Sequence, residues 1–254
     1  MGGEGGMEMR RKYAVLLCAD DSEYIKKVYG GYFKVFVALL GEEGETWDVF
    51  HAAKGELPRG DDVIDGYDGF VITGSCSDAH GDDQWIRELV LLLKKLDAKR
   101  KKVLGICFGH QILSRALGGK TGRATKGWDI GVTCIHPSHS TSRLLAALRI
   151  PSHLPVIECH QDEVWEVPPL AEVMAWSEKT GVEMFRYGDH IMGIQGHPEY
   201  NKDILLHLID RLLQRNLIQN CHAEAAKAKL DAREPDREAW KRLCKGFLKG
   251  DPFS

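Results

Sequence analysis

Short apolar runs alternate with longer segments of helical spacing through the first half of the chain. The runs expected to form buried strands are rich in Val, Ile and Tyr and occupy residues 13–18, 46–51, 67–73 and 102–106. The segments expected to form helices cover 24–40, 83–95 and 110–117, and Gly118-Gly119 stops the last one. Strands separated by helices are typical of parallel sheets with crossover connections, so the pattern predicts an α/β fold.

The pattern changes in the second half, where short segments are punctuated by Pro and His and helices are scarce. The candidate strands there are 132–135, 155–159, 173–177, 182–187 and 191–195. Asn201 is placed to cap an amphipathic helix that runs to about residue 216. The Ala-, Lys-, Glu- and Arg-rich residues 221–254 are interrupted by Pro235 and predict one or two peripheral helices.

No internal repeat and no long Gly/Ser linker divides the chain, which favours one compact domain. We therefore expect a flexible N-terminal segment over 1–12 and a catalytic domain over 13–220. Residues 221–254 are expected to form a helical tail that packs on this domain or extends from it.

Composition and charge exclude several classes of protein. Among 254 residues, 43% are hydrophobic and 28% charged, which is ordinary for a globular protein and excludes disordered and collagen-like chains. The net charge of −3 leaves no basic field for sequence-independent nucleic-acid binding. No apolar run reaches the length of a membrane span, and the N-terminal residues lack the apolar region of a secretion signal. We expect a cytosolic protein that binds neither nucleic acid nor membranes.

The seven cysteines do not form a recognisable framework. Their number is odd and the two nearest in sequence are 23 residues apart, so neither paired disulfides nor a zinc knuckle is indicated. We expect reduced thiols that are mostly buried. The dipeptide His136-Pro137 followed by Ser138-His139 has no second ligand pair at metal-binding spacing, and we expect neither a metal nor a cofactor.

One cysteine lies in a pattern with chemical meaning, Gly105-Ile106-Cys107-Phe108-Gly109, between a predicted strand and a predicted helix. Glycines two residues before and two after a nucleophile allow the tight strand-to-helix turn that exposes its side chain. A helix start beside the thiol is expected to lower its pKa and favour the reactive thiolate. The alternative is a buried structural cysteine in a glycine-rich turn.

A reactive cysteine needs a base, and the base needs an orienting group. His197-Pro198-Glu199 supplies both directly after a predicted strand. In an extended segment residues i and i+2 point to the same side, so Glu199 can accept from one imidazole nitrogen while the other faces Cys107. The alternative is a histidine in an ordinary surface loop.

Acyl transfer also needs N–H donors aimed at the carbonyl oxygen as it gains charge. The Phe108 N–H, directly after the nucleophile, is one natural donor. The turn Thr73-Gly74-Ser75 offers the Ser75 N–H as a second, with Gly74 permitting unusual backbone angles. Without Cys107, an ordinary strand-ending turn would explain this segment equally well.

In this order and at these separations, the motifs resemble the class I glutamine amidotransferase family over roughly residues 13–216. The matching segments are Thr73-Gly74-Ser75, Gly105-Ile106-Cys107-Phe108-Gly109-His110-Gln111, Gly127-Trp128, Ile130-Gly131, His160-Gln161-Asp162-Glu163 and Gly196-His197-Pro198-Glu199. The resemblance implies a flavodoxin-like domain with a mostly parallel sheet and a smaller antiparallel one. It also implies a Cys107-His197-Glu199 triad that forms a γ-glutamyl thioester and releases it to water.

The family resemblance further implies a glutamyl pocket lined by Gln111, His160, Gln161 and Asp162, near Gly74. The loop reads Cys159-His160-Gln161-Asp162, where the family more often has Ser or Asn, His and Gly. Asp162 could meet the substrate amine or cap a turn. Trp128 fits a packing role at the pocket rim better than a chemical one.

Within the family the chain is similar to the plant γ-glutamyl peptidases. That resemblance implies hydrolysis of the γ-glutamyl bond of glutathione or its conjugates, in sulfur metabolism that includes glucosinolate biosynthesis. Because no fused synthetase follows the domain, we expect water to finish the reaction without an obligatory synthetase partner. Two alternatives stay open: a glutaminase subunit that supplies ammonia to a separate synthetase, and a non-catalytic binding or redox-sensing protein.

Overall fold

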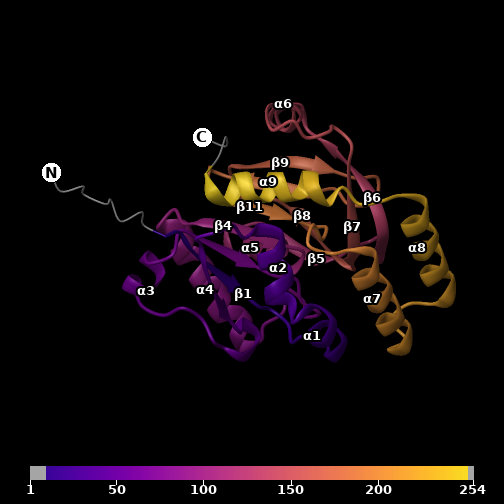
Figure 1. Cartoon of the computed structure of the whole chain (residues 1–254), viewed down its shortest axis with the longest axis horizontal. Coiled ribbons are helices and arrows are strands. Elements are labelled where there is room, and N and C mark those ends of the chain that lie inside the picture. The colour runs from indigo at the N-terminus through magenta and orange to yellow at the C-terminus, as the bar shows by residue number, and fades with distance from the viewer. Residues whose placement is uncertain (1–9, 251–254) are drawn as a thin grey trace.

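A sheet of nine strands forms the centre of the molecule in the computed structural model, which describes residues 10–250 (Figure 1). One half is parallel and has the order β2-β1-β3-β4-β11, with these bounds: β2 (Thr46–Phe50), β1 (Lys12–Leu16), β3 (Gly69–Ile72), β4 (Lys102–Ile106) and β11 (Ile191–Ile194). This order is that of a flavodoxin-like fold, as the family resemblance implied.

Antiparallel strands continue the sheet beyond β11 in the order β10-β9-β6-β7. Their bounds are β10 (Met184–Tyr187), β9 (Ala171–Trp176), β6 (Asp129–Pro137) and β7 (Leu154–His160). A separate antiparallel pair joins β5 (Lys120–Arg123) to β8 (Asp162–Glu166). The predicted architecture, a large mostly parallel sheet with a small antiparallel one, is confirmed.

Helices cover both faces of the parallel half because its strands carry apolar side chains on both sides. Tyr13 and Val15 of β1 pack in one core cluster with residues of α2 (Tyr32–Leu40) and α9 (Arg237–Lys249). Ala14 and Leu16 point to the other face and pack with α4 (Gln84–Ala98) and α5 (Phe108–Ala116). This alternation of buried side chains is expected for strands covered on both faces.

The remaining helices are α1 (Glu23–Tyr29), α3 (Asp61–Asp65), α6 (His139–Ala147), α7 (Lys202–Gln214) and α8 (Asn220–Ala232), with a short 3₁₀ turn over Ala52–Lys54. The Asn201 side chain caps α7 by accepting the Ile204 N–H at 2.8 Å, as its position predicted. None of the described helices is both long and apolar enough to cross a lipid bilayer.

One local prediction was wrong. The expected helix over 24–40 is two helices, because Gly30 and Gly31 have φ values of 74° and 99° that interrupt helical geometry. Helices are scarce in the middle of the chain as expected, where α6 lies, and the short strands β5 and β8 were not predicted.

The last described helix is a core element and not a peripheral one. Trp240 and Phe247 of α9 are fully buried, and the Trp240 Nε1–H donates to the Pro155 carbonyl at 3.0 Å. The Arg11 guanidinium donates to the Lys249 carbonyl at 3.0 Å, which ties the start of β1 to the end of this helix. Of the segment expected to be flexible, residues 1–9 lie outside the described part of the chain, and Lys12 already belongs to β1.

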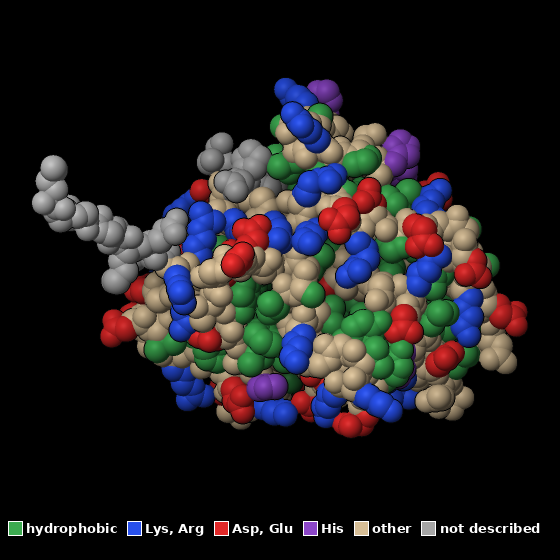
Figure 2. Space-filling view, in the orientation of Figure 1, with side chains coloured by type: hydrophobic (Ala, Val, Ile, Leu, Met, Phe, Trp, Pro, Cys, Tyr) green, Lys and Arg blue, Asp and Glu red, His purple; other side chains and the backbone are tan. Residues whose placement is uncertain are grey.

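All seven cysteines are free, but the expectation that most are buried was wrong. Cys18, Cys107 and Cys244 are buried, whereas Cys76 and Cys221 are exposed. On the face of the molecule in Figure 2, Lys and Arg side chains are interspersed with Asp and Glu. The described residues of that face therefore present no field of a single sign.

Candidate active site

A cavity of about 310 Å³ opens beyond the carboxyl ends of β3, β4 and β11. Nearly all of the side chains singled out from the sequence line it: Gly74, Ser75, Cys107, Gln111, Trp128, His160, Gln161, Asp162, His197 and Glu199. The Phe108 side chain does not line the cavity; it is buried and stacks on Trp85 with ring centroids 5.5 Å apart. The predicted constellation therefore converges on one place in the fold.

Cys107 lies on a strained turn between β4 and α5. Its φ of 52° and ψ of −105° are unusual for a residue other than glycine. The Cys107 N–H donates to the Ile194 carbonyl at 2.8 Å, which fixes the turn to the end of β11. A Cβ added to Gly105 would lie 2.5 Å from the Gly109 carbonyl oxygen. A Cβ added to Gly109 would lie 2.2 Å from the Ile72 carbonyl oxygen. Both flanking glycines are therefore required by close packing, as a nucleophile elbow demands.

The pKa of the Cys107 thiol differs from the sequence expectation. Burial raises this pKa well above its usual value, and the nearby Cys159, Glu158 and Glu199 add to the rise. The Phe108 N–H at the helix start opposes the rise but is the smaller effect. The prediction of a lowered thiol pKa was wrong, and deprotonation of Cys107 depends on a base in the cavity.

His197 is the predicted base, and three contacts hold it in the cavity. Its Nδ1 donates to the Glu199 Oε1 at 2.8 Å, and both side chains are buried. The His197 N–H donates to the Ile157 carbonyl at 2.7 Å. The imidazole lies parallel to the Tyr200 ring, with centroids 4.0 Å apart and an interplanar angle of 3°. Because Nδ1 is engaged by Glu199, Nε2 is the nitrogen left to exchange protons.

Gly74 brings the two halves of the site together, for a reason other than the one predicted. It is not among the residues with positive φ, so unusual backbone angles do not explain it. A Cβ at this position would lie 3.0 Å from His197 Cε1 and 3.7 Å from Cys107 Cβ. The absence of a side chain therefore leaves room for the imidazole beside the cysteine.

The two expected oxyanion donors follow buried strands at the same edge of the sheet. Phe108 is the first residue of α5, and its N–H approaches the Cys107 sulfur. The Ser75 N–H has no backbone acceptor within residues 10–250, and Ser75 lines the cavity. The Ser75 N–H is thus open to a ligand in the cavity, and the Phe108 N–H lies beside the sulfur, as donors to an anionic oxygen should.

Gln111 and His160 are occupied by the protein itself. The Gln111 Nε2 donates to the Asp162 carbonyl at 2.9 Å and to the Gln195 Oε1 at 3.1 Å. The His160 Nδ1 lies 2.9 Å from the same Asp162 carbonyl. The Gln111 and His160 side chains therefore fix the loop that forms a wall of the cavity. Trp128 also lines the cavity; it is half-buried and packs against an apolar cluster.

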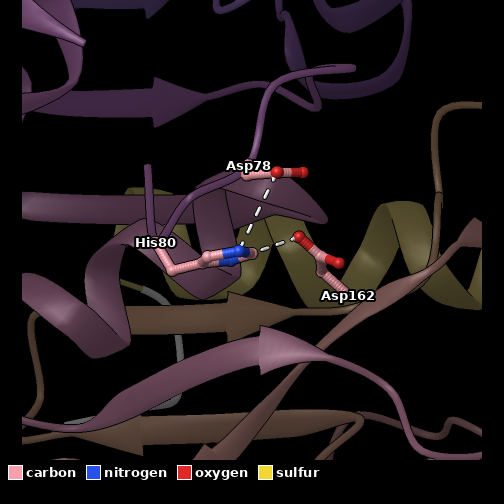
Figure 3. A group of neighbouring side chains, drawn as sticks. All are labelled: Asp78, His80 and Asp162. Atoms are coloured by element: carbon pink, nitrogen blue, oxygen red, sulfur yellow. Dashed lines mark ion pairs between the residues drawn. The ribbon is translucent and has the colours of Figure 1, made fainter. Parts of the chain in front are cut away.

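Asp78, His80 and Asp162 point toward one another (Figure 3). Their potential ligand atoms lie within 4.8 Å of one another. His80 Nδ1 lies 3.5 Å from the Asp162 carboxylate and His80 Nε2 lies 3.8 Å from that of Asp78. Arg123 already neutralises both carboxylates, at 3.1 Å from Asp78 and 2.7 Å from Asp162. A guanidinium at this position makes the group an ion-pair network at the cavity edge, which does not favour a cation.

Several cavity residues were not found from the sequence. Tyr200 contributes an aromatic wall, Arg211 contributes positive charge from α7, and Arg215 contributes it from the residue after that helix. The Arg spacing of four residues within an amphipathic helix was an available signal, because it places both on one face. Among the tyrosines of α1 and α2, Tyr32 lines the cavity as an aromatic wall, whereas Tyr24 and Tyr29 donate to Asp203 at 2.6 Å.

Comparisons with known proteins agree with this geometry. Residues 28–205 match the model of the family "Glutamine amidotransferase class-I". The chain is 51% identical to gamma-glutamyl peptidase 5 of Arabidopsis thaliana over 95% of its own length and 96% of the relative's. It is 49% identical to gamma-glutamyl peptidase 3 of the same organism, with 96% and 99% coverage.

Solved structures show the same fold at low identity. A glutamine amidotransferase from Thermotoga maritima superposes with a TM-score of 0.69 at 20% identity, covering 94% of this chain and 99% of the other. A glutamine amidotransferase from Methylobacillus flagellatus gives 0.68 at 19% identity, with 95% and 93% coverage.

Proposed function

The chain belongs to the class I glutamine amidotransferase family, and on that basis we propose that it is a thiol hydrolase that cleaves γ-glutamyl bonds of small peptides. The observation that carries this proposal is the pairing of a buried cysteine elbow at Cys107 with the His197-Glu199 hydrogen bond in one cavity. The relatives named gamma-glutamyl peptidases, at 46–51% identity over nearly the whole chain, support the same activity.

In the proposed reaction the Cys107 sulfur attacks the γ-carbonyl carbon of the substrate while His197 Nε2 takes the thiol proton. The N–H groups of Ser75 and Phe108 stabilise the oxyanion. His197 then protonates the leaving amine, the C–N bond breaks and a γ-glutamyl thioester remains on Cys107. Water, deprotonated by His197, hydrolyses the thioester and releases glutamate. Glu199 keeps the imidazole in the required tautomer throughout.

Glutathione or a glutathione conjugate is the substrate that fits the charges around the cavity. Its leaving group ends in a glycine carboxylate, and Arg211 on α7 and Arg215 directly after α7 line the cavity. Tyr32 lines the same cavity as an aromatic wall. An apolar group attached to the substrate sulfur would find a surface on Tyr32, and guanidinium groups suit a carboxylate.

The test is a substrate panel of glutathione, an S-alkyl glutathione conjugate and glutamine. We expect equal amounts of glutamate and the Cys-Gly product from the first two. Cys107→Ser and Cys107→Ala should abolish turnover. Cys221→Ser is the matched control, because Cys221 is exposed on α8 and does not line the cavity.

The other outcomes separate the alternatives. Ammonia released from glutamine, with no product from either glutathione compound, would replace the peptidase with a glutaminase. Turnover that is unaffected by Cys107→Ala would contradict the proposed nucleophile. Absence of turnover on every γ-glutamyl compound would leave the fold without the hydrolytic function proposed for it.

A further inference from the structure

The segment that carries the catalytic base is held by two backbone hydrogen bonds beside two buried acids. The His197 N–H donates to the Ile157 carbonyl at 2.7 Å, and the Gln195 N–H donates to the Glu183 carbonyl at 2.8 Å. Glu158 directly follows Ile157 on β7, and Glu183 directly precedes β10. Glu158 and Glu183, here called the carboxyl pair, therefore flank residues 195–197 from two sides.

The carboxyl pair is sealed from solvent and has few donors. Glu158 and Glu183 are 0% and 1% exposed, and neither Glu158 oxygen meets a hydrogen-bond donor within the described residues. Glu183 faces the Ser177 hydroxyl, a neutral donor that can serve only one of its oxygens. The two carboxyl groups are close enough to share a hydrogen bond once one of them carries a proton. Buried polar atoms without partners are costly, so a proton held between the two groups accounts for the arrangement.

His160 extends the carboxyl pair toward the cavity wall. Its Nε2 lies 3.3 Å from Glu158 Oε2. Its Nδ1 faces the Asp162 carbonyl, an acceptor only, so Nδ1 carries the hydrogen and the neutral ring offers no donor at Nε2. In this tautomer Nε2 is an acceptor, so it can take a hydrogen bond from a protonated Glu158.

The carboxyl pair faces titratable and charged groups from several elements. They are Asp129 from β6, Lys229 from α8, His160 and Cys159 from β7, Cys107 before α5 and Glu199 from the segment after β11. The Lys229 ammonium lies 3.8 Å from the Asp129 carboxylate. Its positive charge therefore offsets the charge of Asp129 more than that of the carboxyl pair. Burial raises the pKa of both Glu158 and Glu183 well above the usual carboxyl value.

We propose that Glu158 and Glu183 are positioning residues that share a proton at neutral pH, and that this neutral contact holds the segment of His197 in its working place. A Cβ on Gly196 would lie 2.6 Å from Glu158 Oε1, so the carboxyl lies directly against the backbone that leads to His197. Loss of the proton would create two like charges in a dry site. Their repulsion would separate β7 from residue 183 and move the imidazole relative to Cys107.

The test is the pH dependence of kcat and kcat/KM for wild type and the Glu158→Gln/Glu183→Gln double variant. Two facing amides keep the size and can hydrogen bond to each other, but they cannot ionise. We expect wild-type kcat to fall as the carboxyl pair loses its proton at alkaline pH, and the double variant to lose this fall. Glu158→Ala should lower kcat about 10-fold or more with little change in KM, because the base is displaced while the substrate contacts remain.

Glu163→Gln is the matched control, because burial also raises the pKa of this half-buried acid on β8 while its side chain does not line the cavity. Its pH profile should superpose on that of wild type. A double Gln variant whose kcat profile superposes on that of wild type would overturn the proposal. The proposal would also be overturned if Glu163→Gln removed the alkaline fall in kcat as completely as the double Gln variant does.

The kinetic part rests on the function proposed above, so a second readout is independent of it. Infrared spectra of wild type at neutral pH should contain the C=O stretch of a protonated carboxyl that disappears in the double Gln variant. A protein that hydrolyses no γ-glutamyl compound would still show this band. Absence of the band at neutral pH would refute the shared proton, whatever the substrate proves to be.

Discussion

The imidazole of His197 lies flat on the phenol ring of Tyr200, with centroids 4.0 Å apart and planes 3° from parallel. The hydrogen bond to Glu199 fixes one edge of the imidazole, and the Tyr200 ring fixes one of its faces. Together they leave His197 little freedom to turn away from Cys107. Several expectations for variants follow from this double restraint.

Tyr200→Leu should lower kcat about 10-fold, because the imidazole loses the flat surface that sets its plane and a small misplacement of a catalytic group is costly. Tyr200→Phe retains the ring and should stay within about twofold of wild type. Steady-state kinetics on a γ-glutamyl peptide measure both. Equal losses in the two variants would show that the hydroxyl, rather than the stacked ring, is what matters.

Glu199→Gln should lower kcat by about 10²-fold or more, because an amide can present its N–H to Nδ1 and favour the wrong tautomer of His197. The melting temperature should change far less than kcat, since the replacement has the same shape. Glu199→Asp, which keeps the charge, should recover part of the activity. If Glu199→Gln keeps wild-type kcat, the orienting role is disproved.

Gly74→Ala should lower kcat because the added Cβ would lie 3.0 Å from His197 Cε1 and 3.7 Å from Cys107 Cβ. The imidazole must give way by a few tenths of an ångström, which we expect to cost about 10-fold in kcat. The matched control is Gly181→Ala, where an added Cβ meets nothing within 4 Å. Similar kcat values for Gly74→Ala and Gly181→Ala would show that the imidazole of His197 does not need the space beside Gly74.

Arg211→Gln should raise KM for glutathione about 10-fold, which corresponds to the loss of about 1.4 kcal/mol of carboxylate binding. A γ-glutamyl anilide has no glycine carboxylate, so its KM should be nearly unchanged. The measurement is the change in KM that Arg211→Gln causes for glutathione, divided by the change that it causes for the anilide. Equal increases for both substrates would place Arg211 elsewhere in the site.

Stability should also depend on the carboxyl pair. The folded-state pKa values of Glu158 and Glu183 are raised, so their contribution is fully present below the ordinary carboxyl pKa of about 4.3 and is lost as pH rises toward the folded-state values. Relative to the Glu158→Gln/Glu183→Gln variant, wild type should therefore lose stability as pH rises through that window. Melting temperatures over a pH series check this, and a constant difference would contradict it.

The residues that line the cavity were predicted better than the connections around it. The proximity of Cys107, His197 and Glu199 was predictable because a cysteine between two glycines and a His-Pro-Glu segment each follow a buried strand, and parallel strands bring their carboxyl ends together. The pairing of Gly105 with Gly193 places β4 beside β11 and so completes the constellation.

Other features depend on contacts between distant segments and could not be predicted in this way. The strands β5 and β8 are four and five residues long and carry charges, so neither has a clear alternating pattern. The pKa of Cys107 is set by burial and by Glu158 and Glu199, which no local motif reveals. Glu158 and Glu183 are single acids in apolar strand regions whose proximity exists only in the folded sheet.

The neighbouring strands β4 and β11 belong to distant parts of the chain, with β5 to β10 between them in sequence. During folding, β11 can dock beside β4 only after that long intervening segment has been ordered or looped out, which is slow compared with local structure formation. Recovery of activity in a refolding experiment should therefore follow the slowest phase, later than the return of helical signal. In an incompletely folded chain Cys107 is separated from His197, the base proposed for it, so we expect such a chain to lack hydrolase activity.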